Sequence, residues 1–414
     1  MSTSAEASPP LRILWVRLGG IWPLTSGGRV RTFQTLAQLS RRHQVTLLTT
    51  HTAGDDPEEL RRRLPACVEV VSVPYAPPKR GTPRFALALA RSWLSADPVD
   101  LVKMRVPALR AATRARAHAG AVDLCVADFL HSMPNVPMNR GLPVLLFEHN
   151  VEHLIWKRLA DIDTRRWRRA LLEVEWRKMR RREVAACRSA TLTVAVSEAD
   201  RDVLAAAAPG ARVCAVPTGV DTAYFSPNGY QPVSARLVFT GALEWYPNED
   251  AMLHFVGTIL PLIREQVPDV SLTIVGRRPS ARLRAFVEGV PGITIAADVP
   301  DVRPYMGQAA VYVVPLRVGG GTRLKIFEAL AMRMAVVSTA VGAEGLPMVP
   351  GVHYLQADDS EPFAAAVVEL LRNPERREAI ARAGRRLVEE RYAWAQVVRE
   401  FSARCEEAVA AHAG

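Results

Sequence analysis

One stretch constrains this chain more than any other: residues 313–331, VVPLRVGGGTRLKIFEALA, in which an apolar strand runs into three glycines and then a helix. Glycines at such a turn let the backbone approach a ligand closely, and the N–H groups of a helix start attract anions. Arg323 and Lys325 stand in the first helical turn, where a cation is unfavourable by about 0.3–1 kcal/mol unless an anion lies nearby. The stretch therefore predicts a site for a phosphate-bearing ligand.

The helical spacing of this stretch places Lys325 and Glu328 on one face, so both side chains can serve one ligand. An ordinary strand-to-helix turn followed by a solvated i,i+3 ion pair would have the same spacing. The motif taken alone leaves both interpretations open.

Length and composition set the class of protein. The 414 residues are too many for one ordinary core, which predicts two domains, and 49% hydrophobic with 23% charged residues is typical of a globular chain. No apolar run reaches the roughly 18 residues of a spanning helix, and residues 1–10 lack the features of a secretion signal. Five dispersed cysteines favour a reducing cytoplasm and suggest no metal site. A net charge of +11 predicts an anionic partner without identifying it.

The order of apolar runs predicts an α/β fold. A buried strand at 11–16, a glycine-containing loop, a helix at 30–41 and a strand at 45–49 open the chain as a parallel sheet. Further short apolar runs alternate with helical stretches and indicate a doubly wound domain; they lie at 68–73, 124–127, 144–147 and 192–196.

A second α/β series follows a segment rich in proline and glycine. We expect an N-terminal domain over 11–200, a linker region over 201–235, a C-terminal domain over 236–392, and a last helix over 393–414 that packs back on the N-terminal domain. Ligands of such sheets bind at the carboxyl ends of the strands.

Several motifs, taken in order, resemble one known family. The 313–331 stretch is similar to the donor site of the retaining glycosyltransferases of family 4; three other stretches resemble further signatures of that family: 196–198, 216–227 and 340–346. The resemblance covers essentially the whole chain. It implies the GT-B fold, in which two Rossmann-like domains face a central cleft.

What the resemblance implies is transfer of a sugar from a nucleotide diphosphate donor, with retention of configuration and without a metal ion or other cofactor. Negative charge develops on the leaving phosphate, which requires positioned cations and helix-start amides. Glu328 matches the second glutamate of the family's paired-glutamate motif, which binds the ribose hydroxyls of the donor, and a carboxylate suits that role because it accepts two O–H donors.

The chain departs from the family pattern at two places. The first glutamate of the pair is replaced by Gly320, so backbone amides of Gly320 and Gly321, next to Thr322, are the expected substitutes. The family's phosphate-binding Arg and Lys follow the first strand of the C-terminal domain, but residues 240–248, TGALEWYPN, contain no cation. We expect Arg323 and Lys325 to take over this role.

Gly241, within that cation-free segment, still permits close approach of the backbone to the donor. In the N-terminal half, His149 follows a strand where the family puts a histidine facing the donor sugar, although an ordinary structural histidine would fit the sequence too. Gly27, Gly28 and Arg31 lie in a loop and helix start where the family brings donor phosphate and acceptor together; a solvated helix start is the alternative for Arg31.

Residues 157–188 carry most of the excess charge, with twelve Lys or Arg against five acidic residues. Trp156, Trp167, Leu171 and Val174 make the segment partly amphipathic, so peripheral contact with an anionic membrane is one interpretation and a solvated Arg-rich helix is the other. Nucleic acid is not an expected partner, because the segment lacks an aromatic platform or a helix-turn-helix signature.

The sequence thus predicts a metal-independent glycosyltransferase that uses a UDP- or GDP-linked sugar. We expect a glycan or lipid-linked acceptor, a role in surface polysaccharide or glycolipid synthesis, and a cytoplasmic location, peripheral to the inner face of the membrane. A GT-B protein that binds nucleotide or sugar without transfer and a sugar-nucleotide epimerase stay open as alternatives. The base, the sugar, the acceptor and the oligomeric state do not follow from the sequence.

Overall fold

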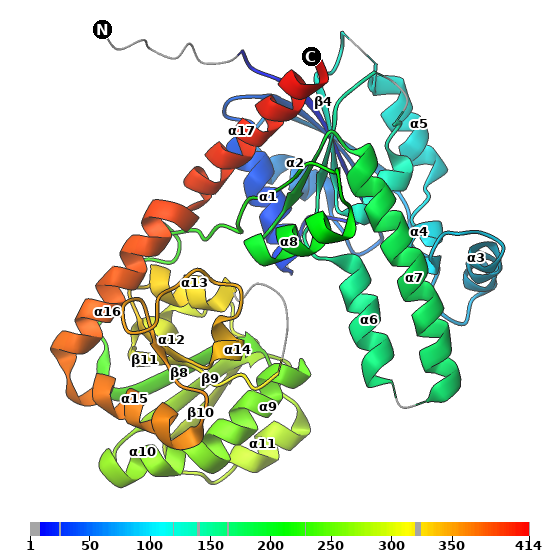
Figure 1. Cartoon of the computed structure of the whole chain (residues 1–414). Helices are drawn as coiled ribbons and strands as arrows, with labels where there is room; N and C mark the ends of the chain where they lie inside the picture. Colours follow the sequence, from blue (N-terminus) through cyan, green and yellow to red (C-terminus); the bar gives the residue numbers. More distant parts are fainter. Residues whose placement is uncertain are drawn as a thin grey trace, which may run out of the picture. The chain divides into compact units, whose positions relative to one another are not determined.

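The computed structural model describes residues 9–24, 26–118, 120–138, 141–163, 165–227, 229–318 and 324–413. The chain divides into two compact units, each with a parallel sheet flanked by helices (Figure 1). Unit 1 comprises Met1–Pro217 and Val397–Gly414, and unit 2 comprises Thr218–Gln396. The predicted α/β class with two doubly wound halves is confirmed.

The described part of unit 1 has a seven-stranded parallel sheet in the order β3-β2-β1-β4-β5-β6-β7. The central strands β4 and β5 are buried at every position, as expected for apolar strands covered by helices on both faces. The strands are β1 (Arg12–Arg17), β2 (Gln44–His51), β3 (Val68–Pro74), β4 (Leu124–Asp128), β5 (Val144–Phe147), β6 (Leu192–Ala195) and β7 (Val213–Ala215).

The helices of unit 1 connect these strands and carry the segments that matter for function. Helices α6 and α7 run side by side as an antiparallel hairpin (Figure 1). The helices are α1 (Gly27–Leu39), α2 (Pro57–Arg63), α3 (Pro83–Trp93), α4 (Val99–Lys103), α5 (Pro107–Arg116), the 3₁₀ helix η1 (Leu130–Asn135), α6 (Glu152–Ile162), α7 (Arg166–Ser189), α8 (Glu198–Ala207) and α17 (Trp394–Ala413).

Unit 2 repeats the architecture with a six-stranded parallel sheet, as far as the described residues show, in the order β10-β9-β8-β11-β12-β13. Its core includes the fully buried Phe239, Tyr312 and Phe327. The strands are β8 (Val233–Ala242), β9 (Ser271–Arg277), β10 (Ile293–Ala297), β11 (Ala309–Val314), β12 (Ala335–Ser338) and β13 (Leu355–Gln356).

The helical stretch after β8 is divided by a π-helical turn, η2, into α9 and α10, and a second π turn, η3, ends α16. The helical elements of unit 2 are α9 (Tyr246–His254), η2 (Phe255–Ile259), α10 (Leu260–Gln266), α11 (Ala281–Val287), α12 (Arg303–Gly307), α13 (Leu324–Ala331), α14 (Ala340–Ala343), α15 (Ser360–Arg372), α16 (Pro374–Leu387) and η3 (Val388–Tyr392).

The linker expected over 201–235 differs from the structure. Most of α8 and all of β7 fall inside that range, and β7 pairs with β6 in the sheet of unit 1. The division between the units comes after Pro217. A three-residue edge strand carries too little apolar periodicity to be recognised in the sequence.

The last helix, α17, belongs to unit 1 from Val397 onwards. Its Phe401 ring lies 5.7 Å from Trp15 and 4.8 Å from Phe147, which are on β1 and β5. The side chain of Ser402 is hydrogen-bonded at 2.7 Å to Nε2 of the buried His43. The end of the chain is therefore part of the core of unit 1.

Candidate active-site residues in the two units

In unit 2, Lys325 reaches the carboxyl end of strand β8. Its Nζ donates a hydrogen bond of 2.8 Å to Oδ1 of Asn248 and lies 4.1 Å from the centre of the Phe239 ring. A Cβ atom added at Gly241 would lie 3.1 Å from this Nζ and 2.8 Å from Nδ2 of Asn248. The absence of a side chain at Gly241 leaves room for the ammonium group beside the backbone.

The side-chain amide of Asn248 is held in place by a second hydrogen bond. It is buried, and its Nδ2 donates to the carbonyl oxygen of Ala242 over 2.9 Å. This hydrogen bond fixes the amide so that Oδ1 faces the Lys325 ammonium. The segment 240–248 has no cation of its own, and a cation from α13 is brought to it.

Glu328 lies one turn after Lys325 on α13 and is half-buried. Burial raises the pKa of this carboxyl to about 7, although the positive charge of Lys325 opposes the shift. The predicted shared face of Lys325 and Glu328 is consistent with this electrostatic contact. A carboxyl so placed ionises readily when hydroxyl donors or a further cation arrive.

Four of the predicted donor-site residues lie outside the described residues: Gly320, Gly321, Thr322 and Arg323. The donor contacts expected of them remain predictions. Of the predicted set in this unit, the structure brings together Gly241 and Lys325, with Glu328 on the same helix as Lys325.

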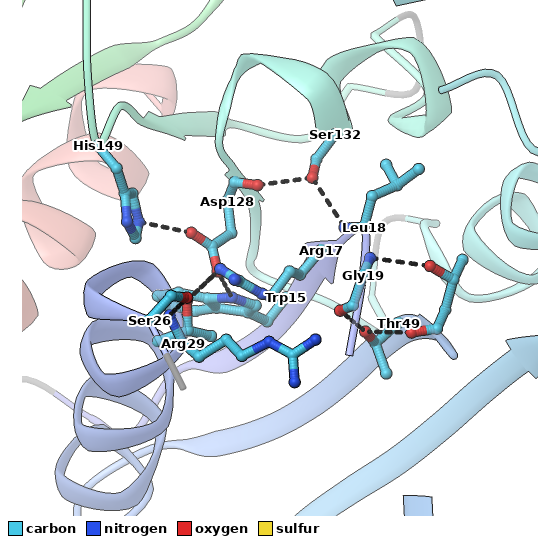
Figure 2. A network of polar contacts seen from close by, with 12 residues as sticks. Trp15, Arg17, Leu18, Gly19, Ser26, Arg29, Thr49, Asp128, Ser132 and His149 are labelled. Atoms are coloured by element: carbon cyan, nitrogen blue, oxygen red, sulfur yellow. Dashed lines mark hydrogen bonds and ion pairs between the residues drawn. The ribbon is translucent and has the colours of Figure 1, made fainter. Parts of the chain in front are cut away.

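In unit 1, the carboxylate of Asp128 organises a buried polar network at the end of β4 (Figure 2). Its Oδ2 accepts hydrogen bonds from Nε1 of Trp15 at 3.1 Å, Nη1 of Arg17 at 2.9 Å and Oγ1 of Thr32 at 2.6 Å. Burial opposes ionisation of Asp128, but Arg17 and His149 outweigh it and hold the pKa of the carboxyl below its ordinary value. The network therefore contains a permanent negative charge.

His149 follows β5 and points toward this carboxylate (Figure 2). Its Nε2 lies 2.7 Å from Oδ1 of Asp128, and its ring stacks on Phe129 with centroids 3.7 Å apart. Burial lowers the pKa of His149 to about 4, although the Asp128 carboxylate opposes the shift. The imidazole is thus neutral at physiological pH, oriented by Asp128, and its Nδ1 has no hydrogen-bond partner among the described residues.

The first turn of α1 lies beside this ring. A Cβ atom at Gly28 would be 3.8 Å from Nδ1 of His149 and 2.9 Å from Cζ of Phe129. Gly27 is the first residue of α1, and the Ser26 side chain caps the helix by accepting from the Arg29 N–H at 3.4 Å. The first turn of α1 thus packs against the rings of Phe129 and His149 at Gly28.

Arg31, one turn into α1, is buried, so the solvated-helix alternative for this residue is wrong. Burial lowers its pKa to about 10, with the Asp128 charge opposing, and it stays cationic at neutral pH. The predicted residues Gly28, Arg31 and His149 therefore come together around Asp128. His149 is itself buried, so both the structural and the site interpretation of this histidine stay open.

Asp128, Arg17 and Thr32 were not among the residues predicted from the sequence. A carboxylate at the very end of an apolar strand, as in LCVAD, is a usable signal, because such positions lie at the binding edge of a parallel sheet. Arg17 is a similar case at the end of β1.

The loop that carries His149 is tied to α7 by Glu183. One carboxylate oxygen accepts the Glu152 N–H at 2.7 Å, and the other accepts the His153 N–H at 3.3 Å and contacts Nδ1 of His153. Glu148 links the same loop to the segment after β4, since its carboxylate accepts the Leu130 N–H at 3.2 Å. Burial, together with the charges of Glu183 and Glu152, raises the pKa of Glu148.

No cluster of three or more His, Cys, Asp or Glu in the described residues is arranged to bind a metal ion. No described helix combines the length and apolar character needed to cross a bilayer.

Two family models match consecutive parts of the chain. Residues 25–224 match the model described as Glycosyltransferase Family 4, and residues 234–373 match the model described as Glycosyl transferases group 1. The chain belongs to the family 4 glycosyltransferases. The division between the two models falls near the division between the two units.

Curated relatives match part of this family 4 chain. It is 31% identical to a phosphatidyl-myo-inositol mannosyltransferase of Mycobacterium leprae over 201 residues, which are 46% of this chain and 53% of that protein. The chain spans about half, or less, of the length of the curated relatives it matches.

Solved structures show the same fold. A sucrose-phosphate synthase of Thermosynechococcus elongatus superposes with a TM-score of 0.67 at 17% identity, covering 97% of this chain and 100% of that one. Anabaena HepE, crystallised with UDP and glucose, superposes with a TM-score of 0.61 at 14% identity, covering 96% and 100%. This family 4 chain therefore has the GT-B fold.

Proposed function

We propose that this protein transfers a sugar from a nucleotide diphosphate donor to a glycan or lipid-linked acceptor, with retention of configuration and without a metal ion. The observation that carries the proposal is the Lys325 ammonium beside Gly241 and Asn248. A family 4 enzyme needs a cation at the end of this strand, and the chain supplies it from α13 instead of from the segment after β8.

Unit 2 holds the nucleotide in this proposal. Lys325 neutralises charge on the donor phosphates, and Glu328 accepts hydrogen bonds from the two ribose hydroxyls. Both roles gain in strength from partial burial, because charged groups interact more strongly when water is excluded. UDP is our first choice of nucleotide, supported by the HepE structure with UDP and glucose, and GDP is the second.

Unit 1 supplies the groups that act at the transferred sugar. The neutral His149, oriented by Asp128, offers Nδ1 as an acceptor for a sugar hydroxyl. Arg31, buried beside Asp128, supplies positive potential close to His149, which suits an anionic group of a substrate. This division of labour requires no metal or other cofactor.

The α6–α7 hairpin supports a lipid-linked acceptor and a location on the inner face of the membrane. Trp167, Leu171 and Val174 are exposed on α7, next to Arg166 and Arg177. Such a mixed surface binds anionic bilayers, each nearby cation contributing about 1 kcal/mol. The Mycobacterium leprae relative, whose name specifies a phosphatidylinositol acceptor, fits this choice.

The test is incubation of the pure protein with UDP- and GDP-sugars and lipid extracts, measuring nucleotide release and the anomeric configuration of the product by NMR. We expect release that survives EDTA and falls at least tenfold in Glu328→Ala, Lys325→Ala and His149→Ala. Release unchanged in all three variants would contradict the assignment.

Two other outcomes identify the alternatives. Thermal stabilisation by UDP or GDP without release on any acceptor would indicate a binding protein, an alternative motivated by the glycine at position 320. Conversion of the donor to an isomeric sugar nucleotide in the absence of acceptor would indicate an epimerase.

A further inference from the structure

Unit 1 also contains a pocket to which no role has been assigned so far. It has a volume of about 600 Å³ and lies between α3, α4 and the α6–α7 hairpin. This volume is within the range of small-molecule sites. It is therefore large enough for an acceptor headgroup.

The position of the pocket relates it to the reaction. His131 and Glu152 line it, and each lies three residues beyond a member of the polar network, Asp128 and His149 respectively. Both follow the carboxyl ends of neighbouring parallel strands, which meet at one edge of the sheet. One end of the pocket thus adjoins the residues proposed to act at the sugar.

One wall of the pocket is apolar and open to solvent. Ile155 and Leu159 on α6 line it although they remain 40% and 43% exposed, and Trp156 and Phe85 add aromatic surface. Exposed apolar side chains grouped at a pocket indicate an apolar ligand group. A hydrocarbon chain can lie along this wall.

The charges of the pocket favour an anion. Lys103 pairs with Asp100, and Arg168 pairs with Asp163 at 3.0 Å. In contrast, Arg80 and Arg165 line the pocket, are exposed, and form no ion pair with a carboxylate among the described residues. Two guanidinium groups without a carboxylate partner suit a phosphate, which accepts several N–H donors at once.

We infer that this pocket binds the acceptor, and that the acceptor is a lipid phosphate: a hydrocarbon chain along Ile155 and Leu159, a phosphate at Arg80 and Arg165, and a hydroxyl-bearing headgroup toward His131 and Glu152. This inference rests on the proposed function and names its acceptor class. A sugar-bearing polyprenyl phosphate and a phosphoglycerolipid both supply such a hydroxyl, and the experiment separates them.

The experiment measures binding to the full chain by isothermal titration, with farnesyl phosphate and lysophosphatidic acid below their micellar concentrations as probes, and farnesol and inorganic phosphate as controls. We expect at least one of the two lipid phosphates to bind. The one that binds more tightly identifies which of the two lipid classes is the acceptor. Arg80→Ala/Arg165→Ala should weaken it by about tenfold or more, as the loss of charge-assisted hydrogen bonds predicts. Ile155→Glu should also abolish binding.

The matched control is Arg110→Ala/Arg284→Ala, which removes two exposed arginines that do not line the pocket. Equal affinity in wild type and Arg80→Ala/Arg165→Ala, or no binding of either lipid phosphate to the wild type, would overturn the inference. Failure of the proposed function has a different signature, because it appears as absent nucleotide release with lipid phosphate still bound. Unchanged thermal unfolding of both double variants, followed by circular dichroism, verifies that they are folded.

Discussion

The ammonium of Lys325 and the amide of Asn248 are joined by a hydrogen bond across 77 positions of the sequence. This bond connects α13 to the segment that follows β8, so that a cation missing from one element is supplied by another. Asn248 itself is anchored to the Ala242 carbonyl, which means that the ammonium is positioned before any ligand arrives. Preorganised charge of this kind costs no rearrangement on binding.

Replacing Lys325 by methionine should weaken nucleotide binding. The variant keeps most of the side-chain volume and its packing on Phe239 but loses the charge, so we expect the Kd for UDP or GDP to rise about ten- to hundredfold. Titration calorimetry measures this directly. Arg282→Met, an exposed cation on α11, is the matched control and should leave the Kd unchanged. Equal affinity of wild type and Lys325→Met would argue against a phosphate role.

Glu328 should make the stability of the unliganded protein depend on pH. Its folded-state pKa is raised to about 7, so its stabilising contribution is present below pH 4.5 and is lost as the pH rises through 7. Compared with Glu328→Gln, the wild type should lose about 1–2 kcal/mol of unfolding free energy between pH 5 and pH 8. Urea denaturation at the two pH values measures this difference.

The same carboxyl should govern nucleotide affinity. Ionised Glu328 accepts hydroxyl hydrogen bonds better than the protonated form, so binding of a UDP-sugar, whose phosphates do not titrate in this range, should tighten from pH 6 to pH 8 in the wild type and not in Glu328→Gln. His149, with its pKa near 4, does not titrate in this window. A pH dependence that persists in Glu328→Gln would assign the effect to another group.

Much of the fold was predictable, because parallel strands buried on both faces appear as short apolar runs and the helices between them keep their periodicity. The predicted boundaries of elements were wrong where the sequence pattern was short. The three residues of β7 and the π turn at Phe255–Ile259 have no distinct sequence pattern. The predicted linker consequently included α8 residues that belong to unit 1.

The site was predictable in part, because some of its contacts are local in sequence and others are not. Lys325 and Glu328 lie on one helix, so their relationship is local and follows from spacing. The contact of Lys325 with Asn248 and that of His149 with Asp128 join elements distant in sequence. Arg31 was predicted as a candidate, but only its burial beside Asp128 separates it from a solvated arginine.

Substituting Gly28 by alanine should impair catalysis. The new methyl group would approach Cζ of Phe129 to 2.9 Å, and this ring has little freedom because it stacks on His149. We expect a kcat reduced at least tenfold and a loss of about 1–3 kcal/mol in stability, with UDP affinity of unit 2 unchanged. Gly54→Ala, where nothing lies within 4 Å of the added Cβ, should behave as wild type. Full activity in Gly28→Ala would show that the His149 ring is not constrained there.

Glu183 should act as a positioning residue for His149. Its two carboxylate oxygens accept the N–H groups of Glu152 and His153, and glutamine can offer only one acceptor oxygen to them. Glu183→Gln should therefore release the loop after β5 and lower kcat about three- to tenfold, with the KM for the donor unchanged, because one backbone hydrogen bond of roughly 0.5–1.5 kcal/mol is lost.

Imidazole ¹⁵N shifts should change at His149, which general destabilisation in a folded protein would not produce. Glu173→Gln, on the same helix but paired, among the described residues, with Lys157 and Arg177, serves as the control. Unchanged His149 shifts in Glu183→Gln would leave Glu183 a purely structural cap of α6.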